Sequence, residues 1–145
     1  MKTLTLILVL VASSNLFGQN SQKMPPSSFF TEVRALLPNA NGSYASNHDD
    51  VFYTIYKIVN QTFTEGVISI NVIDRDKDES TWSYTVDWSK ISSISIASVT
   101  CPKDKCKKTS ALNIYGERSF VACVYFLEKD DEKMQAIIDK YLKKD

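Results

Sequence analysis

Lysines cluster around a pair of closely spaced cysteines, in the segment of the chain best suited to holding an anion. The segment CPKDKCKK places Cys101 and Cys106 on either side of four residues. Proline and charged residues favour a turn, so the two sulfurs could meet at the neck of a hairpin. The candidate binding residues at this tip are Lys103, Lys105, Lys107 and Lys108. They suit an anionic lipid, a polysaccharide or an acidic protein surface, although lysines also keep hairpins soluble and block edge pairing.

The cysteine spacing favours a structural disulfide between Cys101 and Cys106. A redox motif ordinarily has two residues between its cysteines, and a zinc site needs two further ligands, whereas the chain has three cysteines and one histidine in all. A loop this short constrains the unfolded chain little, so we expect it to contribute about 2 kcal/mol. Cys123 lies within SFVACVYFL and is predicted to be a small buried apolar residue.

Aromatic residues form the second group of candidate binding residues. Trp82, Tyr84 and Trp88 lie in and beside one predicted strand. If such rings are exposed on one face of a sheet, they are suited to binding sugars or peptides. If they are buried, they belong to the hydrophobic core. Four tyrosines add to the same supply of rings, namely Tyr53, Tyr56, Tyr115 and Tyr125.

Acidic residues crowd one turn, where Asp74, Asp76 and Asp78 are weak candidates for a calcium ion. The match to an EF-hand loop fails at two places, because Glu79 stands where glycine is required and Thr85 stands where an acid is required. Basic residues alternate with the aspartates as well. We therefore expect a solvated hairpin tip and no bound metal.

Catalytic motifs are missing from the sequence. It contains no GxSxG, Walker loop, GxGxxG or HExxH, and its one histidine, His48, stands in a polar segment typical of a turn. Two acids distant in the chain could still converge, so a small acid-assisted hydrolase stays an alternative. No catalytic residue and no cofactor is predicted.

The N-terminus has the pattern of a secretory signal peptide over residues 1–18. Lys2 precedes an apolar run from Leu4 to Ala12, which is about half of the roughly 20 residues that a membrane-spanning helix needs. Residues 19–27 are predicted to be a flexible lead-in, and residues 28–145 a single globular domain. The protein is expected to be secreted or periplasmic, without stable insertion in a membrane.

Charge argues against a nucleic-acid partner. The whole chain has 17 basic and 17 acidic residues, and loss of Lys2 leaves one net negative charge. Binding to nucleic acid generally requires a basic domain face. The expected partner is an unknown protein or an anionic or saccharide ligand, with the chain a monomer or weak oligomer.

Periodicity predicts a helix, a series of strands and a closing helix. FFTEVRALL has an apolar stripe with Ser28 as a candidate cap, and DDEKMQAIIDKYLKK has another, with acids first and lysines last. Six runs between them read as strands because they alternate or are rich in β-branched and aromatic residues. The runs are VFYTIYKIV, VISINVID, TWSYTVDW, ISSISIASV, ALNIYG and SFVACVYFLE.

Short connections between these runs require antiparallel pairing, so we predict an α+β protein with a strongly bent antiparallel sheet or partly open barrel of six to seven strands. Residues 51–144, and WSYTVDWSKISSISI in particular, resemble a pleckstrin-homology-like barrel, whose C-terminal helix plugs one open end. The resemblance implies a platform for lipid head groups or peptides. A cystatin-like helix on a curved sheet is the alternative arrangement.

These observations together favour an exported, non-enzymatic binding or interaction domain. An alternative in a different class is an extracytoplasmic inhibitor or adaptor that caps another protein, with the CPKDKC hairpin as its contact edge.

Overall fold

The computed structural model describes residues 23–47, 54–74 and 77–143. The predicted signal peptide lies outside these ranges, as does most of the predicted lead-in. Three residues discussed above also lie outside them, namely His48, Tyr53 and Asp76. No helix within the described ranges has both the length and the apolar character needed to cross a membrane.

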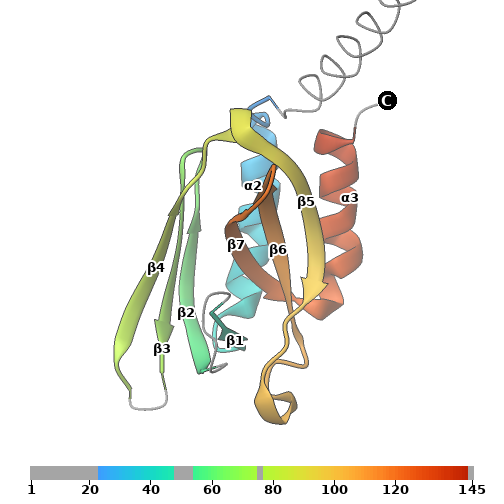
Figure 1. Cartoon of the computed structure of the whole chain (residues 1–145). Helices are drawn as coiled ribbons and strands as arrows, with labels where there is room; N and C mark the ends of the chain where they lie inside the picture. The colour runs from blue at the N-terminus through green and yellow to red at the C-terminus, as the bar shows by residue number, and fades with distance from the viewer. Residues whose placement is uncertain (1–22, 48–53, 75–76, 144–145) are drawn as a thin grey trace, which may run out of the picture.

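Seven strands form two antiparallel sheets, as Figure 1 shows. The four-stranded sheet has the order β1-β2-β3-β4, and its strands are β1 (Tyr44–Ser46), β2 (Ile55–Phe63), β3 (Val67–Ile73) and β4 (Glu79–Thr85). The three-stranded sheet has the order β5-β6-β7, and its strands are β5 (Ile91–Ser98), β6 (Thr109–Gly116) and β7 (Phe120–Leu127). The predicted α+β class is therefore confirmed.

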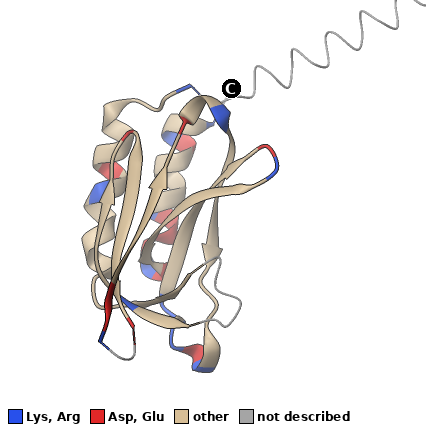
Figure 2. Cartoon of the chain, turned by 60° about the vertical axis from the view of Figure 1, so that its left-hand side comes forward, with Lys and Arg blue, Asp and Glu red and all other residues tan. Residues whose placement is uncertain are grey.

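Two helices pack side by side and cover one face of the three-stranded sheet, and the first of them also contacts β2 of the other sheet (Figure 1). They are α2 (Ser27–Leu36) and α3 (Asp131–Leu142). Short 3-10 turns complete the chain at η1 (Leu37–Ala40), η2 (Trp88–Lys90), η3 (Pro102–Asp104) and η4 (Glu128–Asp130). Charged residues lie mostly on the helices and at the loops, while the strands have few (Figure 2).

Both faces of the three-stranded sheet are buried. Alternate residues along its strands point to opposite faces and belong to two different core clusters. Leu112 and Val124 pack with the helices, whereas Ala111 and Cys123 pack against the four-stranded sheet. The predicted burial of Cys123 is confirmed, since only 2% of it is exposed. This double burial explains why SFVACVYFL is apolar almost throughout.

A side-chain amide joins the two sheets where no strand pairing does. Gln61 Nε2 donates to the backbone oxygen of Tyr125 at 2.7 Å, and the Tyr125 amide donates to Gln61 Oε1 at 2.7 Å. Gln61 thus occupies both backbone groups of Tyr125 on the outer edge of β7. A register shift between Ile58 and Asn60 in β2 puts Gln61 on the same inner face as the buried Ile58, although the two are three residues apart.

Differences from the sequence-based expectations lie at element ends and in one short strand. The seventh strand, β1, lies between Gly42 and Asn47, where the sequence indicates only a turn. The α2 helix begins at Ser27 with Pro26 as its N-cap, so Ser28 is not the cap. The predicted strand at 51–59 is β2, which starts at Ile55 among the described residues and continues to Phe63.

Replacement of Gln61 by Ala is expected to destabilise the protein by more than the same replacement of an exposed glutamine does. It leaves the N–H and C=O of Tyr125 without their partner, and each buried unpaired group costs about 1–3 kcal/mol. Urea unfolding of Gln61→Ala gives the loss, with Gln135→Ala as the control because Gln135 bonds only Asp139 on an exposed helix face. Equal losses in the two variants would show that the bridge is unimportant.

Candidate functional site

The cysteine loop has the predicted disulfide, between Cys101 and Cys106, with 5.6 Å between the two Cα atoms. Within the loop, Lys103 and Asp104 adopt φ values of 63° and 54°. Non-glycine residues seldom adopt this left-handed conformation, so closure of the ring by the disulfide helps to hold it. A hydrogen bond from the Lys107 amide to the Asp104 oxygen, at 3.2 Å, closes the turn.

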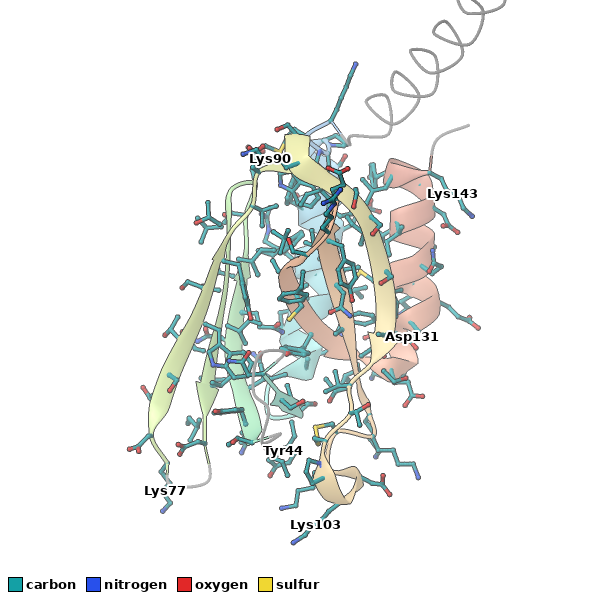
Figure 3. The ribbon with its side chains drawn as sticks, in the orientation of Figure 1. Tyr44, Lys77, Lys90, Lys103, Asp131 and Lys143 are labelled. Atoms are coloured by element: carbon teal, nitrogen blue, oxygen red, sulfur yellow. A yellow bond between two sulfur atoms is a disulfide. The ribbon has the colours of Figure 1, made fainter. Side chains whose placement is uncertain are left out.

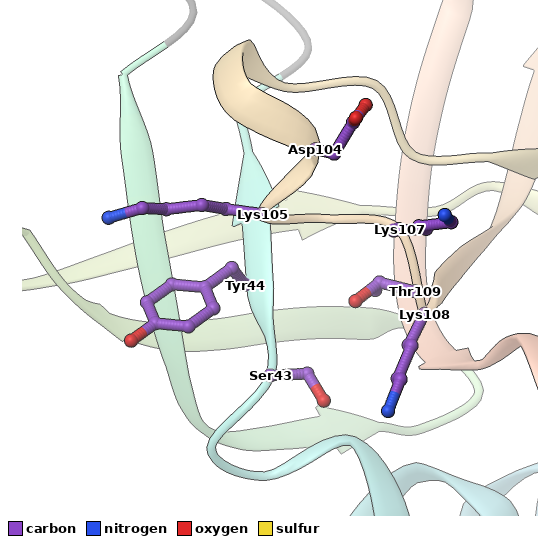
Figure 4. Close-up of a pocket in the computed structure, with 7 residues that line it drawn as sticks. All are labelled: Ser43, Tyr44, Asp104, Lys105, Lys107, Lys108 and Thr109. Atoms are coloured by element: carbon purple, nitrogen blue, oxygen red, sulfur yellow. The ribbon is translucent and has the colours of Figure 1, made fainter.

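Three of the four predicted lysines line one hollow at the base of this loop. The hollow has a volume of about 290 Å³, and we call it the lysine pocket. Its lining residues, drawn in Figure 4, are Ser43, Tyr44, Asp104, Lys105, Lys107, Lys108 and Thr109. All four lysines of the loop are exposed, but Lys103 is not part of the lining.

The β1 strand supplies the opposite wall of the pocket, which the sequence did not indicate. Tyr44 is the first residue of β1 and Ser43 directly precedes it, and 39% of Tyr44 is exposed. β1 has three residues, which is too short for an alternation of apolar and polar residues to be recognised. The one local signal is Gly42, whose φ of 87° permits the turn that leads the chain into β1.

Hydrogen bonds from the core fix the two walls relative to each other. Tyr125 Oη donates to the Ser46 oxygen at 3.0 Å, and Ser46 Oγ donates to the Thr100 oxygen at 2.9 Å. Thr100 immediately precedes Cys101, so β1 and the cysteine loop share one anchor. Burial of Tyr125, followed by the neighbouring Cys123, raises the pKa of this phenol well above its usual range. Tyr125 therefore remains a neutral hydrogen-bond donor.

A backbone contact anchors the second half of the loop. The Glu128 amide donates to the Lys108 oxygen at 2.9 Å, and the Thr109 amide donates to the Cys106 oxygen at 2.9 Å. Lys107 and Lys108 thus leave a fixed backbone, although their own side chains are exposed. The site therefore combines a backbone held by hydrogen bonds with exposed ammonium groups, which can reach a charged ligand.

The predicted aromatic binding face is not assembled in the described structure. Trp88 is 2% exposed, packs edge-on against Phe29 and Phe30, and donates through Nε1 to the Glu65 oxygen at 2.7 Å. It is a core residue and has no surface for a ligand. Trp82 and Tyr84 are half-buried and lie apart from the lysine pocket lining, against rings of the inner cluster.

The acidic turn is a hairpin tip. Asp74 Oδ1 accepts from the Asp78 amide at 3.0 Å, and the Asp74 amide donates to the Asp78 oxygen at 3.1 Å. These bonds close the turn between β3 and β4, while Asp76 lies outside the described residues. No group of three or more His, Cys, Asp or Glu suited to a metal occurs within residues 23–47, 54–74 and 77–143.

The acid-assisted hydrolase gains no support from the carboxyl groups with shifted pKa values. Those shifted among the described residues are Glu32, Asp87 and Asp139, and every shift is downward. The main cause is a side-chain hydrogen bond from Tyr141, Ser89 and Gln135 respectively. A general acid requires the opposite shift, a raised carboxyl pKa.

A second hollow of about 360 Å³ lies between α2 and α3. Lys140 and Glu32 both line it, and they form an ion pair with an N–O distance of 3.2 Å. The cation of Lys140 is thus already matched by a carboxylate. The lysine pocket has a larger excess of positive charge, with three lysines against Asp104, and is the stronger candidate site.

Comparison of the chain with protein-family models, curated proteins and solved structures finds no match. What the pocket binds is therefore inferred from its own residues.

The protein is expected to titrate one free thiol after denaturation without reductant, and three after reduction. Cys101 and Cys106 are consumed by the disulfide, and Cys123 becomes accessible only when the core unfolds. A thiol-reactive dye in guanidinium, with and without prior reductant, measures both numbers. Three thiols in the unreduced sample would contradict the disulfide.

The Tyr125→Phe variant is expected to weaken the attachment of β1. It removes the hydrogen bond to the Ser46 oxygen while the buried ring stays, so a loss of about 1 kcal/mol in the free energy of unfolding is expected. Hydrogen exchange should accelerate at the β1 amides more than at those of β6. Uniform acceleration across both strands would contradict a local anchoring role.

Proposed function

We propose that this protein is an exported, non-enzymatic binding domain that holds an anionic group in the lysine pocket. The observation that carries the proposal is that Lys105, Lys107 and Lys108 all line one hollow. The anion is a carboxylate, sulfate or phosphate, because ammonium groups and hydroxyls donate hydrogen bonds to the oxygens of all three.

Placement of the positive charge supports binding in preference to simple solubility. The chain as a whole has equal numbers of basic and acidic residues. Four of its lysines nevertheless fall within six positions and sit at one end of the strands, where Lys103 and Tyr44 are labelled in Figure 3. A local excess of one sign on a neutral protein attracts an oppositely charged ligand to that place.

Export is supported by two features. The N-terminal pattern of Lys2 and a short apolar run is typical of a signal peptide. The Cys101–Cys106 disulfide fits an oxidising compartment, since such bonds are rare in proteins that stay in the cytosol.

The strand arrangement supports the resemblance to a pleckstrin-homology-like barrel only in outline. Seven strands are followed by a C-terminal helix, which fits that resemblance. However, α3 lies beside α2 against the three-stranded sheet, not at an open end between the sheets. The proposal therefore rests on the pocket and not on the resemblance.

The test compares two double variants that lose the same charge. Lys105→Gln with Lys108→Gln removes two pocket cations, whereas Lys90→Gln with Lys143→Gln removes two at the other end of the molecule, as Figure 3 shows. The probes are a capped tetraglutamate, a tetragalacturonate and a sulfated tetrasaccharide, titrated at low salt by calorimetry.

We expect the pocket variant to bind the preferred probe about fivefold more weakly than wild type. Each exposed ion pair is worth about 0.5 kcal/mol, and two of them give roughly this factor. The control variant should bind within about twofold of wild type. Equal weakening in both variants would show that binding depends only on the net charge of the protein. Absence of binding to all three probes would contradict the proposal.

A further inference from the structure

The residues that line the lysine pocket are of two unlike kinds, as Figure 4 shows. The hydroxyls of Ser43 and Thr109 and the ammonium group of Lys108 lie on one side of β1, and the ring of Tyr44 points to the other side, in the same direction as the side chain of Lys105. An anion alone needs only the ammonium groups and the hydroxyls. The ring therefore indicates a ligand in which an anionic group is attached to a body with a face of its own.

Tyr44 differs from the other partly exposed aromatic residues that the structure describes. The rest lie in edge-to-face contacts with other rings: Tyr56 with Trp82, Tyr84 with Phe120, Tyr115 with Phe120, and Tyr141 with Phe29. Tyr44 takes part in no such ring pair within the described residues. Its ring is also the only aromatic one among the large apolar side chains with the greatest exposure there.

The carboxylate in the pocket lining restricts which ligands the pocket can accept. Asp104 lines the pocket together with the three lysines, and a carboxylate can only accept hydrogen bonds. It repels a second anion but accepts bonds from hydroxyl groups. A ligand with one anionic group and several hydroxyls matches this lining better than a bare phosphate or a run of acidic side chains does.

Resting on the proposed function, we propose that the lysine pocket binds a uronic acid residue of an acidic oligosaccharide. The carboxylate lies against the lysines of the pocket, and the C–H face of the sugar ring lies on the exposed ring of Tyr44. Asp104 accepts from a sugar hydroxyl. A pocket of about 290 Å³ is at the lower end of the range for small-molecule sites and suits one sugar residue of a longer chain.

A membrane surface fits the same lysines less well. The exposed residues of the loop are Pro102, Lys103, Asp104, Lys105, Lys107 and Lys108. None of them is a large apolar side chain that could enter the acyl region, and electrostatic attraction of a few lysines alone gives weak, salt-sensitive binding. Asp104 at the tip adds repulsion from anionic head groups.

The experiment separates the sugar ring from the charge. Tetragalacturonate and tetramannuronate carry four carboxylates each, and so does a tetraglutamate capped at both ends, which has no sugar ring. All three are titrated into wild type and into the Tyr44→Phe and Tyr44→Ala variants. Vesicles with phosphatidylglycerol are tested in parallel by sedimentation. Thermal unfolding checks that the variants fold, as expected for a side chain that is 39% exposed.

We expect at least one tetrauronate to bind about tenfold more tightly than the tetraglutamate, because ring contacts add to the charge. Tyr44→Ala should abolish that advantage, whereas Tyr44→Phe should retain it. The inference is overturned if tetraglutamate binds as tightly as both uronates, if Tyr44→Ala leaves uronate binding unchanged, or if vesicles bind more tightly. These results leave the anion pocket standing, whereas failure of every anionic probe would instead remove the proposed function itself.

Discussion

Tyr125 is the residue through which the core determines the geometry of the surface site. Its backbone groups bind the Gln61 amide, its ring packs against Trp82, and its hydroxyl donates to the Ser46 oxygen. The first contact joins the two sheets, and the last holds β1. Because Ser46 in turn donates to the Thr100 oxygen, the position of the cysteine loop also depends on this buried phenol. A polar network of this kind specifies one arrangement only if all its members are paired.

Burial on both faces of the three-stranded sheet makes that network necessary. The helices cover one face and the four-stranded sheet covers the other, so the outer edge of β7 lies next to the four-stranded sheet, away from solvent. Backbone groups at such an edge need partners, since an unpaired buried amide is costly. Gln61 provides both partners with one side chain. The register shift in β2 accounts for its position on the inner face.

The lysine pocket is held in place by different interactions from those that hold the core. Its lysines are long and exposed, but the backbone that bears them is closed by a disulfide and by hydrogen bonds to β1 and to the Glu128 amide. Because this backbone is already held in place, a ligand loses less binding free energy to the ordering of the loop. Tyr44 and the two hydroxyls add shape to what is otherwise a charged surface.

Local chemistry in the sequence determined the elements, the disulfide and the lysine cluster. Alternation and apolar stripes depend on neighbouring residues alone, so six strands and both helices could be predicted, and the five-residue separation of Cys101 and Cys106 was enough to predict their pairing.

The tertiary structure alone determined which residues form the other wall of the pocket and which aromatic residues are buried. β1 has no pattern of its own and exists because β2 pairs with it, which brings Tyr44 to the loop from more than fifty residues away. Trp88 went to the core because its turn lies between α2 and the β2–β3 connection, where Glu65 accepts its N–H group. Long-range packing decides such placements, and it leaves no signature in the spacing of nearby residues.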